Sequence, residues 1–388
     1  MYQVKTYNVI SPVGLAKLPA SQYAVNKSDD PDALIIRSQD MHTTDFGKNV
    51  KVIARAGAGF NNIPLNKANE QGTVVFNTPG SNANAVKELV IGMLILCNRH
   101  VIDAVNWSAQ LVGADVSLQT EKNKNHFAGH ELVGKTIGVI GLGNVGSRVA
   151  GAAQQLGMKV VGYDPYISVE HALQLSNQIP RLDSLAELLQ QSDFVTIHIP
   201  YTEDNRHLIG ENEIAMMPKG AVLFNYSRTD IVDDVAATQA LDQGHLQLYV
   251  TDFSTQAAVE NPKAIVTPHL GGTTEEAEIN GAVMAANTIR NFLEQGIIHH
   301  SVNMPEMTTP MQYNHRITVM HQNVPNMLGQ ITTAVANANI NIDNLSNQSR
   351  ETMAYTVIDV NQLDGDTEAL IKNLEAIPAV VRVRLLNR

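Results

Sequence analysis

The sequence has very little cysteine: Cys97 is the only one in 388 residues. A lone cysteine cannot form an intrachain disulfide, which fits a reducing cytoplasm, and we expect it to pack on the apolar face of a helix. Long apolar runs are missing as well, because the run Leu89–Cys97 is far shorter than a membrane span. The first residues lack the charged and apolar regions of an export signal. These absences predict a cytoplasmic protein without a membrane partner.

Clusters of lysine and arginine are also missing. The formal net charge is -11, and an acidic chain without a basic patch is a poor partner for nucleic acid or anionic lipid. Hydrophobic residues make up 44% of the chain and charged residues 17%, which is an ordinary globular composition. A chain of 388 residues is too long for one core and predicts two or three domains.

One stretch, Thr136 to Asp164, carries a complete phosphate-binding pattern. A short apolar strand, Thr136–Ile140, runs into Gly141-Leu142-Gly143-Asn144-Val145-Gly146, a G-x-G-x-x-G. An amphipathic helix follows, Gly157 is placed to end it, and the next strand, Lys159–Tyr163, leads to Asp164. Strand, glycine turn, helix and acid in this order predict a dinucleotide-binding unit.

The three glycines of this turn each meet a different requirement. Gly141 allows the tight turn, Gly143 lets the backbone approach a pyrophosphate, and Gly146 brings helix and strand together. The start of the helix adds the positive end of its dipole. Because a carboxylate binds a ribose hydroxyl but repels a 2′-phosphate, Asp164 favours NAD over NADP.

Apolar strands and helical patterns alternate on both sides of this stretch, which predicts an α/β protein with two doubly wound parallel sheets. A buried helix is expected at 84–98, an irregular surface segment at 120–130, and a helix capped by Asp183 further on. The remaining strands are expected at Ala33–Ile36, Val52–Ala54, Thr73–Asn77, Phe194–Ile199, Ala221–Ser227, Leu246–Asp252 and Ile265–Thr267.

The last part of the chain has a different rhythm. A long amphipathic helix is predicted from Thr274 to Gln295, followed by a proline-containing linker without periodicity. Then come a strand from Arg316, a helix, strands on either side of Ser349-Arg350, a helix after Asp366 and a final strand, which is the ferredoxin-like βαββαβ order. The expected domains are a flavodoxin-like domain from 1–98 and 274–303, a Rossmann domain at 99–273, a linker at 304–315 and a ferredoxin-like domain at 316–388.

Polar residues follow several predicted strands, where open α/β sheets bind their ligands. In the larger domain they lie at Asn225–Arg228, Thr251–Phe253 and Thr267–Gly272. In the smaller domain the loops carry Arg37 and Arg55, and two guanidiniums beside bare backbone amides suit a carboxylate or a phosphate. The plain alternative is that either arginine is a solvated surface residue.

Six motifs together resemble one family. They are A-R-A-G-x-G-x-x-N at Ala54–Asn62, N-T-P at Asn77–Pro79, the glycine turn, H-x-P at His198–Pro200, N-x-x-R at Asn225–Arg228 and P-H-x-G at Pro268–Gly271. On these motifs the chain resembles the D-isomer-specific 2-hydroxyacid dehydrogenases over nearly its whole length, and 316–388 resembles an ACT domain. The resemblance implies NAD as cofactor, a substrate-binding role for the smaller α/β domain and a regulatory role for the ACT domain.

The resemblance makes His269 the acid/base and Arg228 the clamp on the substrate's carboxylate and C2 oxygen. The chemistry agrees with these roles. Oxidising an alcohol by hydride loss requires a base for the hydroxyl proton, and imidazole titrates closest to working pH. A fixed guanidinium stabilises the developing carbonyl and holds the substrate in register with the nicotinamide.

The family's third catalytic residue, a glutamate that hydrogen-bonds the histidine, is missing. It is expected four or five residues past Asp252, where this chain has Gln256 and Ala257, and the only carboxylate between Asp252 and His269 is Glu260, expected in a loop. Either Gln256 orients the ring through a neutral hydrogen bond, or Glu260 swings in, or activity is reduced. We favour Gln256 as the partner in catalysis.

The resemblance also implies three groups of binding residues. The cofactor group is Thr78, Gly141, Gly143, Asn144, Val145, Gly146, Asp164, His198, Pro200, Tyr226, Ser227, Asp252, Gly271 and Gly272. The substrate group is Arg37, Ser38, Arg55, Ala56 and Gly57. The effector group, which binds an amino acid in the ACT domain, is His321, Asn323 and Asn341.

The turn of the ACT domain departs from the family at one position, because this chain has Asn326 where the family has glycine. Asparagine tolerates a positive φ better than other non-glycine residues, so we expect the turn to survive. The plain alternative to an effector site is that His321 and Asn323 only cap the following helix.

The resemblance implies NAD-dependent oxidation of D-3-phosphoglycerate to 3-phosphohydroxypyruvate, the first step of L-serine biosynthesis, with an amino-acid effector such as L-serine. A homo-oligomer, dimer or tetramer, is also implied, and no metal site is expected. One alternative is a D-lactate or glyoxylate type reductase with an unrelated tail, against which the arginine loops and the ACT-like tail argue. Another is a non-catalytic NAD sensor similar to the corepressors built on this fold, which the missing glutamate allows.

Overall fold

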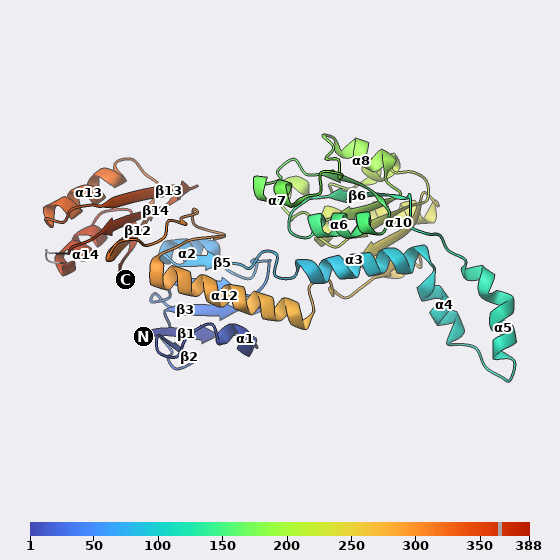
Figure 1. Ribbon diagram of the computed structural model, residues 1–388, viewed down its shortest axis with the longest axis horizontal. Helices are drawn as coiled ribbons and strands as arrows, with labels where there is room; N and C mark the ends of the chain where they lie inside the picture. The colour runs from blue at the N-terminus through green and yellow to red at the C-terminus, as the bar shows by residue number, and fades with distance from the viewer. Residues whose placement is uncertain (364–366) are drawn as a thin grey trace. The chain divides into compact units, whose positions relative to one another are not determined.

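The computed structural model describes residues 1–363 and 367–388, so Asp366, which precedes a predicted helix, lies outside the described residues. The chain divides into two compact units (Figure 1). Unit 1 comprises Met1–Ser81 and Glu278–Arg388, and unit 2 comprises Asn82–Ala277. Residues 82–98 were expected in the first α/β domain, whereas the structure groups them with unit 2. Within residues 1–363 and 367–388, helices lack the combination of length and apolarity needed to cross a membrane.

Unit 1 contains a five-stranded parallel sheet in the order β2-β1-β3-β4-β5, which is the flavodoxin-like order. The strands are β1 Tyr2–Thr6, β2 Tyr23–Val25, β3 Ala33–Ile36, β4 Val52–Arg55 and β5 Val74–Phe76. The sequence pattern does not predict β1 and β2. β1 mixes polar and apolar residues and β2 is very short, so neither has the continuous apolar run of a central parallel strand.

Alternate residues of these strands pack into two different layers, as the pleat of a strand requires. Ala33 and Ile35 of β3 belong to a core shared with the long helix α12, Glu275–Gln295. Ile36, on the opposite face, belongs to a core shared with α2, Leu65–Gln71. The remaining helix of this sheet is the short α1, Pro12–Leu15. The first α/β domain therefore has both faces of its sheet covered.

Unit 2 is built on a six-stranded parallel sheet in the order β11-β10-β9-β8-β6-β7. One face is covered by α3 and α6 and the other by α8 and α10. The strands are β6 Thr136–Ile140, β7 Lys159–Tyr163, β8 Phe194–Ile197, β9 Ala221–Asn225, β10 Leu246–Thr251 and β11 Ala264–Val266. The helices are α3 Ala83–Asn98, α4 Val101–Ser108, α5 Val116–Asn123, α6 Gly146–Gln155, α7 Val169–Gln174, α8 Leu185–Gln191, α9 Glu211–Met216, α10 Asp234–Asp242 and α11 Gln256–Glu260.

Two local predictions in unit 2 are wrong. Ser184, not Asp183, caps α8, because the Ser184 side chain accepts a hydrogen bond from the Glu187 amide. The segment 120–130 is not wholly irregular: α5 runs to Asn123 and a 3₁₀ turn, η1, covers Lys124–Phe127. Its polar composition hides the helix because α5 has no buried face, and apolar periodicity is the main sequence signal for a helix. Two further 3₁₀ turns lie at Glu203–Asn205 (η2) and Thr229–Ile231 (η3).

The end of unit 1 forms the predicted βαββαβ domain. Its antiparallel sheet has the order β13-β14-β12-β15. One face packs on its two helices, and the other contributes Met320 and Tyr355 to the core that contains Phe292 of α12. The elements are β12 His315–Gln322, α13 Met327–Asn337, β13 Asn344–Arg350, β14 Met353–Val360, α14 Thr367–Glu375 and β15 Val380–Asn387.

A buried arginine fixes this domain to the end of α12. The Arg316 side chain is 0% exposed and forms a bidentate ion pair with Asp359, with Nε–Oδ1 and Nη2–Oδ2 distances of 2.6 and 2.9 Å. The same guanidinium donates to the carbonyl oxygens of Gln295, Thr309 and Pro310. All of its N–H donors are therefore satisfied, as a buried guanidinium requires.

We predict that Asp359→Ala lowers the free energy of unfolding by about 3–5 kcal/mol, because it leaves the Arg316 charge buried without its partner. Urea denaturation of the full chain measures the change. Asp29→Ala is the matched control, since Asp29 pairs with Lys5 in full contact with solvent and its loss should cost at most about 1 kcal/mol. Equal effects of the two substitutions would contradict the structural role of the buried pair.

Candidate active site and cofactor-binding turn

The glycine turn follows β6. In the sheet, β6 lies between β7 and β8, where the strand order reverses. Doubly wound sheets bind dinucleotides at such a reversal. Gly141 has a φ of +87°, and a Cβ there would lie 2.5 Å from the His198 carbonyl oxygen. A Cβ at Gly146 would lie 1.8 Å from the Gly141 carbonyl oxygen, whereas one at Gly143 would meet nothing within 4 Å. The turn thus excludes side chains at two glycines and keeps open space beside the third, as a pyrophosphate site requires.

Asp164 is fixed by the backbone of this region. Its Oδ2 accepts the Leu142 amide at 2.9 Å and its Oδ1 accepts the Tyr166 amide at 2.9 Å. A carboxylate has about four acceptor positions, so each oxygen retains one for another donor. The predicted ribose-binding acid is therefore oriented before any ligand arrives.

Two predicted cofactor residues carry polar atoms without a partner. Among the described residues, four buried side-chain polar atoms lack a hydrogen bond, and His198 Nδ1 and the Tyr226 hydroxyl are two of them. His198 Nε2 lies 2.9 Å from the Thr196 hydroxyl, and burial lowers the pKa of His198 to about 3, so the ring is neutral. Burial raises the pKa of Tyr226. Such orphaned groups are rare in folded proteins and are compatible with a site that a ligand completes.

Arg228 is presented by a turn that the Asn225 side chain holds. Asn225 closes β9, its Nδ2 donates to the Arg228 carbonyl at 3.0 Å, and its Oδ1 accepts the Ser227 amide at 3.1 Å. Ser227 Oγ in turn accepts the Ile199 amide from the loop after β8. Desolvation lowers the pKa of the Arg228 guanidinium, but an arginine remains charged. The N-x-x-R motif therefore works as a fixed turn with a cation at its tip.

His269 is exposed and is held in place by Asp252, a carboxylate that is 3% exposed. Asp252 Oδ1 accepts the Leu270 amide and the Thr267 hydroxyl, and its Oδ2 accepts the Gly271 amide at 2.7 Å. The His269 amide donates to the carbonyl oxygens of Asp252 and Thr267, and its φ is +56°. The Phe253 and His269 rings form a T-shaped pair, with centroids 5.2 Å apart. The sequence did not predict this ring contact, although Phe253 follows Asp252 directly.

Gln256 and Glu260 lie on α11, not in a loop as expected for Glu260. Both side chains are exposed, and Gln256 Nε2 donates to Glu260 Oε1 across one turn of the helix. Among the described residues no hydrogen bond connects either side chain to the His269 ring. The spacing of four on a helix would have predicted this pair, had the helix been recognised.

The two arginines predicted to bind substrate follow neighbouring strands of unit 1. Arg55 Nε donates to the Arg37 carbonyl at 2.9 Å and Nη1 to the Gly59 carbonyl at 2.8 Å. Arg37 Nη2 lies 2.6 Å from Glu278 Oε1, a pairing that the sequence did not predict. The loop between them depends on a missed residue, Asn8, whose Oδ1 accepts the amides of 37, 38 and 39.

The structure also places the other residues that were predicted to bind the substrate. Ser38 is exposed, and Ala56 and Gly57 are half-buried. Thr78, assigned to the cofactor group, lies in unit 1, is 1% exposed, and accepts the Gly57 amide at 2.7 Å. Its position thus supports the arginine loop directly.

The predicted effector residues differ sharply in exposure. His321 is 2% exposed, and its ring nitrogens lie within hydrogen-bonding distance of the Gln322 carbonyl and the Thr356 hydroxyl. Asn323 and Asn341 are exposed. Helix α13 begins after Asn326, whose φ of 65° confirms that the turn survives. No side chain forms a capping hydrogen bond at the start of this helix. The alternative in which His321 and Asn323 cap this helix is therefore wrong.

Comparisons with known proteins assign two parts of the chain to known families. Residues 91–271 match the NAD binding domain of the D-isomer specific 2-hydroxyacid dehydrogenases, and residues 309–384 match the ACT domain. D-3-phosphoglycerate dehydrogenase of Escherichia coli K12 is 33% identical over 339 residues, which are 84% of this chain and 79% of that protein. The protein of that name from Methanocaldococcus jannaschii is 32% identical over 348 residues, and this chain spans 64% of its length.

Solved structures show the same fold. NAD⁺-bound 3-phosphoglycerate dehydrogenase of Entamoeba histolytica has a TM-score of 0.61 and 28% identity, covering 78% of this chain and 98% of that one. D-mandelate dehydrogenase of Rhodotorula graminis has a TM-score of 0.65 at 22% identity, covering 80% and 99%, and shows the fold alone. The chain belongs to the D-isomer specific 2-hydroxyacid dehydrogenases and carries an ACT domain near its carboxyl end. Unit 2 contains its NAD-binding domain.

We predict that Asp164→Ala weakens NAD binding about tenfold or more and strengthens NADP binding, because it removes a hydrogen bond to the NAD ribose and the repulsion of the NADP 2′-phosphate. Titration of both cofactors against intrinsic fluorescence gives the two dissociation constants. Asp103→Ala, on the exposed side of α4, is the control and should leave both constants unchanged. An unaltered ratio of the constants in Asp164→Ala would show that another residue recognises the ribose.

Proposed function

We propose that this chain catalyses the NAD-dependent oxidation of D-3-phosphoglycerate to 3-phosphohydroxypyruvate, the first step of L-serine biosynthesis. One observation carries the proposal: Arg228 and His269 follow β9 and β11, the two neighbours of β10, in a parallel sheet whose β6 ends in the glycine turn. Carboxyl ends of parallel strands share one edge of the sheet, so acid/base, cation and cofactor turn belong to one site. The named relatives support the choice of substrate.

The proposed chemistry uses His269 as the base for the substrate's C2 hydroxyl proton. Arg228 binds the carboxylate and the C2 oxygen and stabilises the carbonyl as it forms. NAD, when bound, accepts the hydride from C2. Asp252 contributes by position, since its hydrogen bonds to 267, 270 and 271 set the path of the histidine loop. In the reverse direction the imidazolium returns the proton to the C2 oxygen.

The first α/β domain offers its own cation for a phosphate. We propose Arg55 for this role, because its guanidinium is oriented by two backbone carbonyls and a planar fork is suited to phosphate oxygens. Arg37 is the second candidate in this loop, and its guanidinium pairs with Glu278. Ser38, Ala56 and Gly57 complete the proposed loop through their backbone amides.

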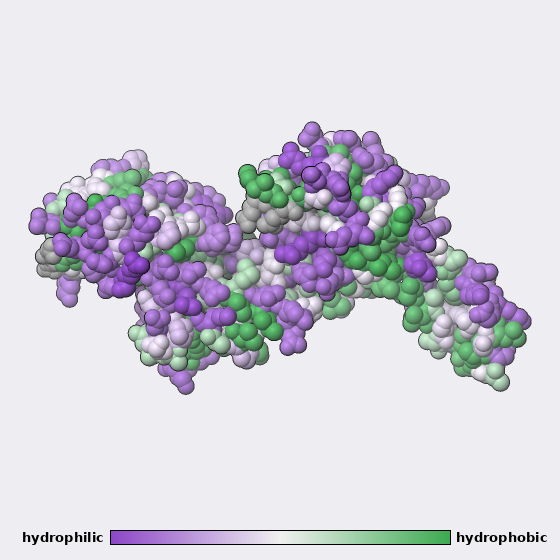
Figure 2. Space-filling view, viewed as in Figure 1, coloured by the Kyte–Doolittle hydropathy of each residue, from purple (hydrophilic) through white to green (hydrophobic). Residues whose placement is uncertain are grey.

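Regulation and assembly form part of the same proposal. The ACT domain would bind an amino-acid effector such as L-serine through Asn323 and Asn341, with His321 joining after it releases Thr356. A homo-oligomer is supported by α4 and α5, whose residues are all described and none of them buried. Figure 2 shows apolar side chains in green over this segment, where Val105, Val112 and Leu118 are 60%, 80% and 54% exposed. Apolar surface of this kind favours a protein partner.

We predict that His269→Ala lowers kcat/KM for phosphohydroxypyruvate reduction by about 10²–10⁴-fold, the usual contribution of a positioned acid/base. NADH affinity should not change, because the imidazole acts on the substrate. Steady-state kinetics and NADH fluorescence titration measure the two effects. His126→Ala, an exposed histidine of η1, controls for general damage. Unchanged turnover in His269→Ala would refute the assignment.

In the structure the Gln256 side chain hydrogen-bonds Glu260 and not the His269 ring; we propose that it turns to the ring in the catalytic complex. We then predict that Gln256→Glu raises the pH of the acidic limb of phosphoglycerate oxidation by about one unit, because a carboxylate brought within hydrogen-bonding distance favours the imidazolium. The base must be neutral to accept the proton, so a higher pKa moves the loss of activity upward. Glu260→Gln should change little.

The measurement is the logarithm of kcat/KM against pH for the parent, each variant and the double variant Gln256→Glu with Glu260→Gln. The double variant removes the negative charge of Glu260, which would repel the new carboxylate at position 256 one turn away on α11. If Glu260→Gln alone displaced the acidic limb of the pH profile and Gln256→Glu did not, Glu260 would be the partner of the histidine.

A further inference from the structure

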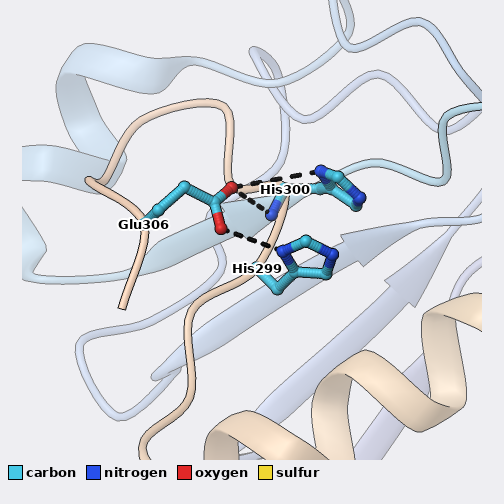
Figure 3. A group of neighbouring side chains, drawn as sticks. All are labelled: His299, His300 and Glu306. Carbon is cyan, nitrogen blue, oxygen red and sulfur yellow. Dashed lines mark hydrogen bonds and ion pairs between the residues drawn. The ribbon is translucent and has the colours of Figure 1, made fainter. Parts of the chain in front are cut away.

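The connection between α12 and β12 carries two exposed histidines and an exposed glutamate that face one another (Figure 3). The His299, His300 and Glu306 side chains are 58%, 50% and 55% exposed. His299 Nδ1 lies 2.9 Å from Glu306 Oε2, and His300 Nδ1 lies 4.0 Å from Glu306 Oε1. One ligand atom from each residue can be chosen so that all lie within 4.8 Å of one another. This is the only such group of three among the residues that the structure describes.

We propose that His299, His300 and Glu306 form a binding site for a divalent transition-metal ion of the Zn²⁺ class. Two imidazoles and one carboxylate are a recurring ligand set for Zn²⁺, with an open position for water. Tetrahedral coordination at about 2.1 Å separates ligand atoms by roughly 3.4 Å, which lies between the two observed separations. The imidazoles select against Mg²⁺ and Ca²⁺, which prefer oxygen ligands.

The backbone at His300 brings the two rings together. Neighbouring side chains of an extended chain point in opposite directions, but His300 has a φ of +61°, in the left-handed region that non-glycine residues seldom occupy. As a result the two ring centroids lie 3.6 Å apart, with the planes inclined by 34°. Two imidazolium charges at this distance would repel each other, whereas two neutral rings can direct lone pairs at one cation.

The loop that carries the three ligands is fixed beneath them. Ile298 and Met307 exchange backbone hydrogen bonds of 2.9 and 2.8 Å, which close the loop. Inside it, buried Ser301 and Asn303 bond to Val75 of β5. The His300 amide also donates to Glu306 Oε1 at 2.6 Å, which orients the carboxylate as outer-shell partners do in metal sites. Three exposed ligands on a rigid base form a preorganised site.

The location suggests what an ion would do to the protein. Arg350 of β13 donates to the Ser301 carbonyl at 2.9 Å, so the loop contacts the ACT domain as well as β5. Glu306 also lines a hollow of about 550 Å³ between this connection and β13. An ion that binds only the closed loop stabilises the folded chain by mass action.

Calorimetric titration of Zn²⁺ into the full, tag-free and chelator-treated chain tests the proposal. We expect one ion per chain at this site, an affinity at least about tenfold lower in His299→Ala and in Glu306→Gln, and no heat from Mg²⁺. The unfolding temperature of the parent should rise with Zn²⁺, and that of the variants should not.

His126→Ala supplies the matched control, since it removes an exposed histidine that belongs to no such group in the described part of the chain. An unfolding temperature without Zn²⁺ that equals that of the parent confirms that each variant is folded. Absence of Zn²⁺ binding by the parent would overturn the proposal. Equal binding by the parent, His299→Ala and Glu306→Gln would overturn it too, because the ion would then lie elsewhere.

Discussion

The buried carboxylate of Asp252 determines where the proposed chemistry takes place. A charged group that is 3% exposed must be satisfied by donors, and Asp252 takes them from the loop after β11. That requirement fixes the loop, and with it His269, relative to β10. Because β9 and β6 belong to the same parallel sheet, the Arg228 turn and the glycine turn share its carboxyl edge. One buried acid thereby relates the acid/base to the rest of the NAD-binding unit.

A comparable constraint holds the ACT domain in unit 1. Arg316 pairs with Asp359 inside the antiparallel sheet and also caps the carbonyl of Gln295 at the end of α12. Tyr355 donates its hydroxyl to the Gly296 carbonyl at 3.0 Å. An effector that changes the sheet of the ACT domain would therefore act on residues that connect directly to the first α/β domain, and the proposed metal loop lies in the same connection.

The parts of the protein that sequence predicted well are those whose signals are local. From Thr136 to Asp164, strand, turn, helix and acid follow one another without a gap, and each appears where expected. Residues whose roles depend on distant partners were missed. Asn8 supports the Arg37 loop from the loop after β1, and Glu278 reaches Arg37 from α12. His321 was predicted to bind an effector, and the burial of its ring against Thr356 of β14 is a packing that no local pattern encodes.

We propose that a chain with His269, Arg228 and Gln256, but without the family's usual glutamate, is a working dehydrogenase for a phosphorylated substrate. The most direct measurement is the oxidation of NADH at 340 nm by the purified parent chain, with phosphohydroxypyruvate, pyruvate and glyoxylate supplied in turn. We expect turnover with phosphohydroxypyruvate and a much lower kcat/KM with the two unphosphorylated acids. Faster reduction of pyruvate or glyoxylate would contradict the substrate, and NADH binding without turnover on any of the three would contradict the enzyme.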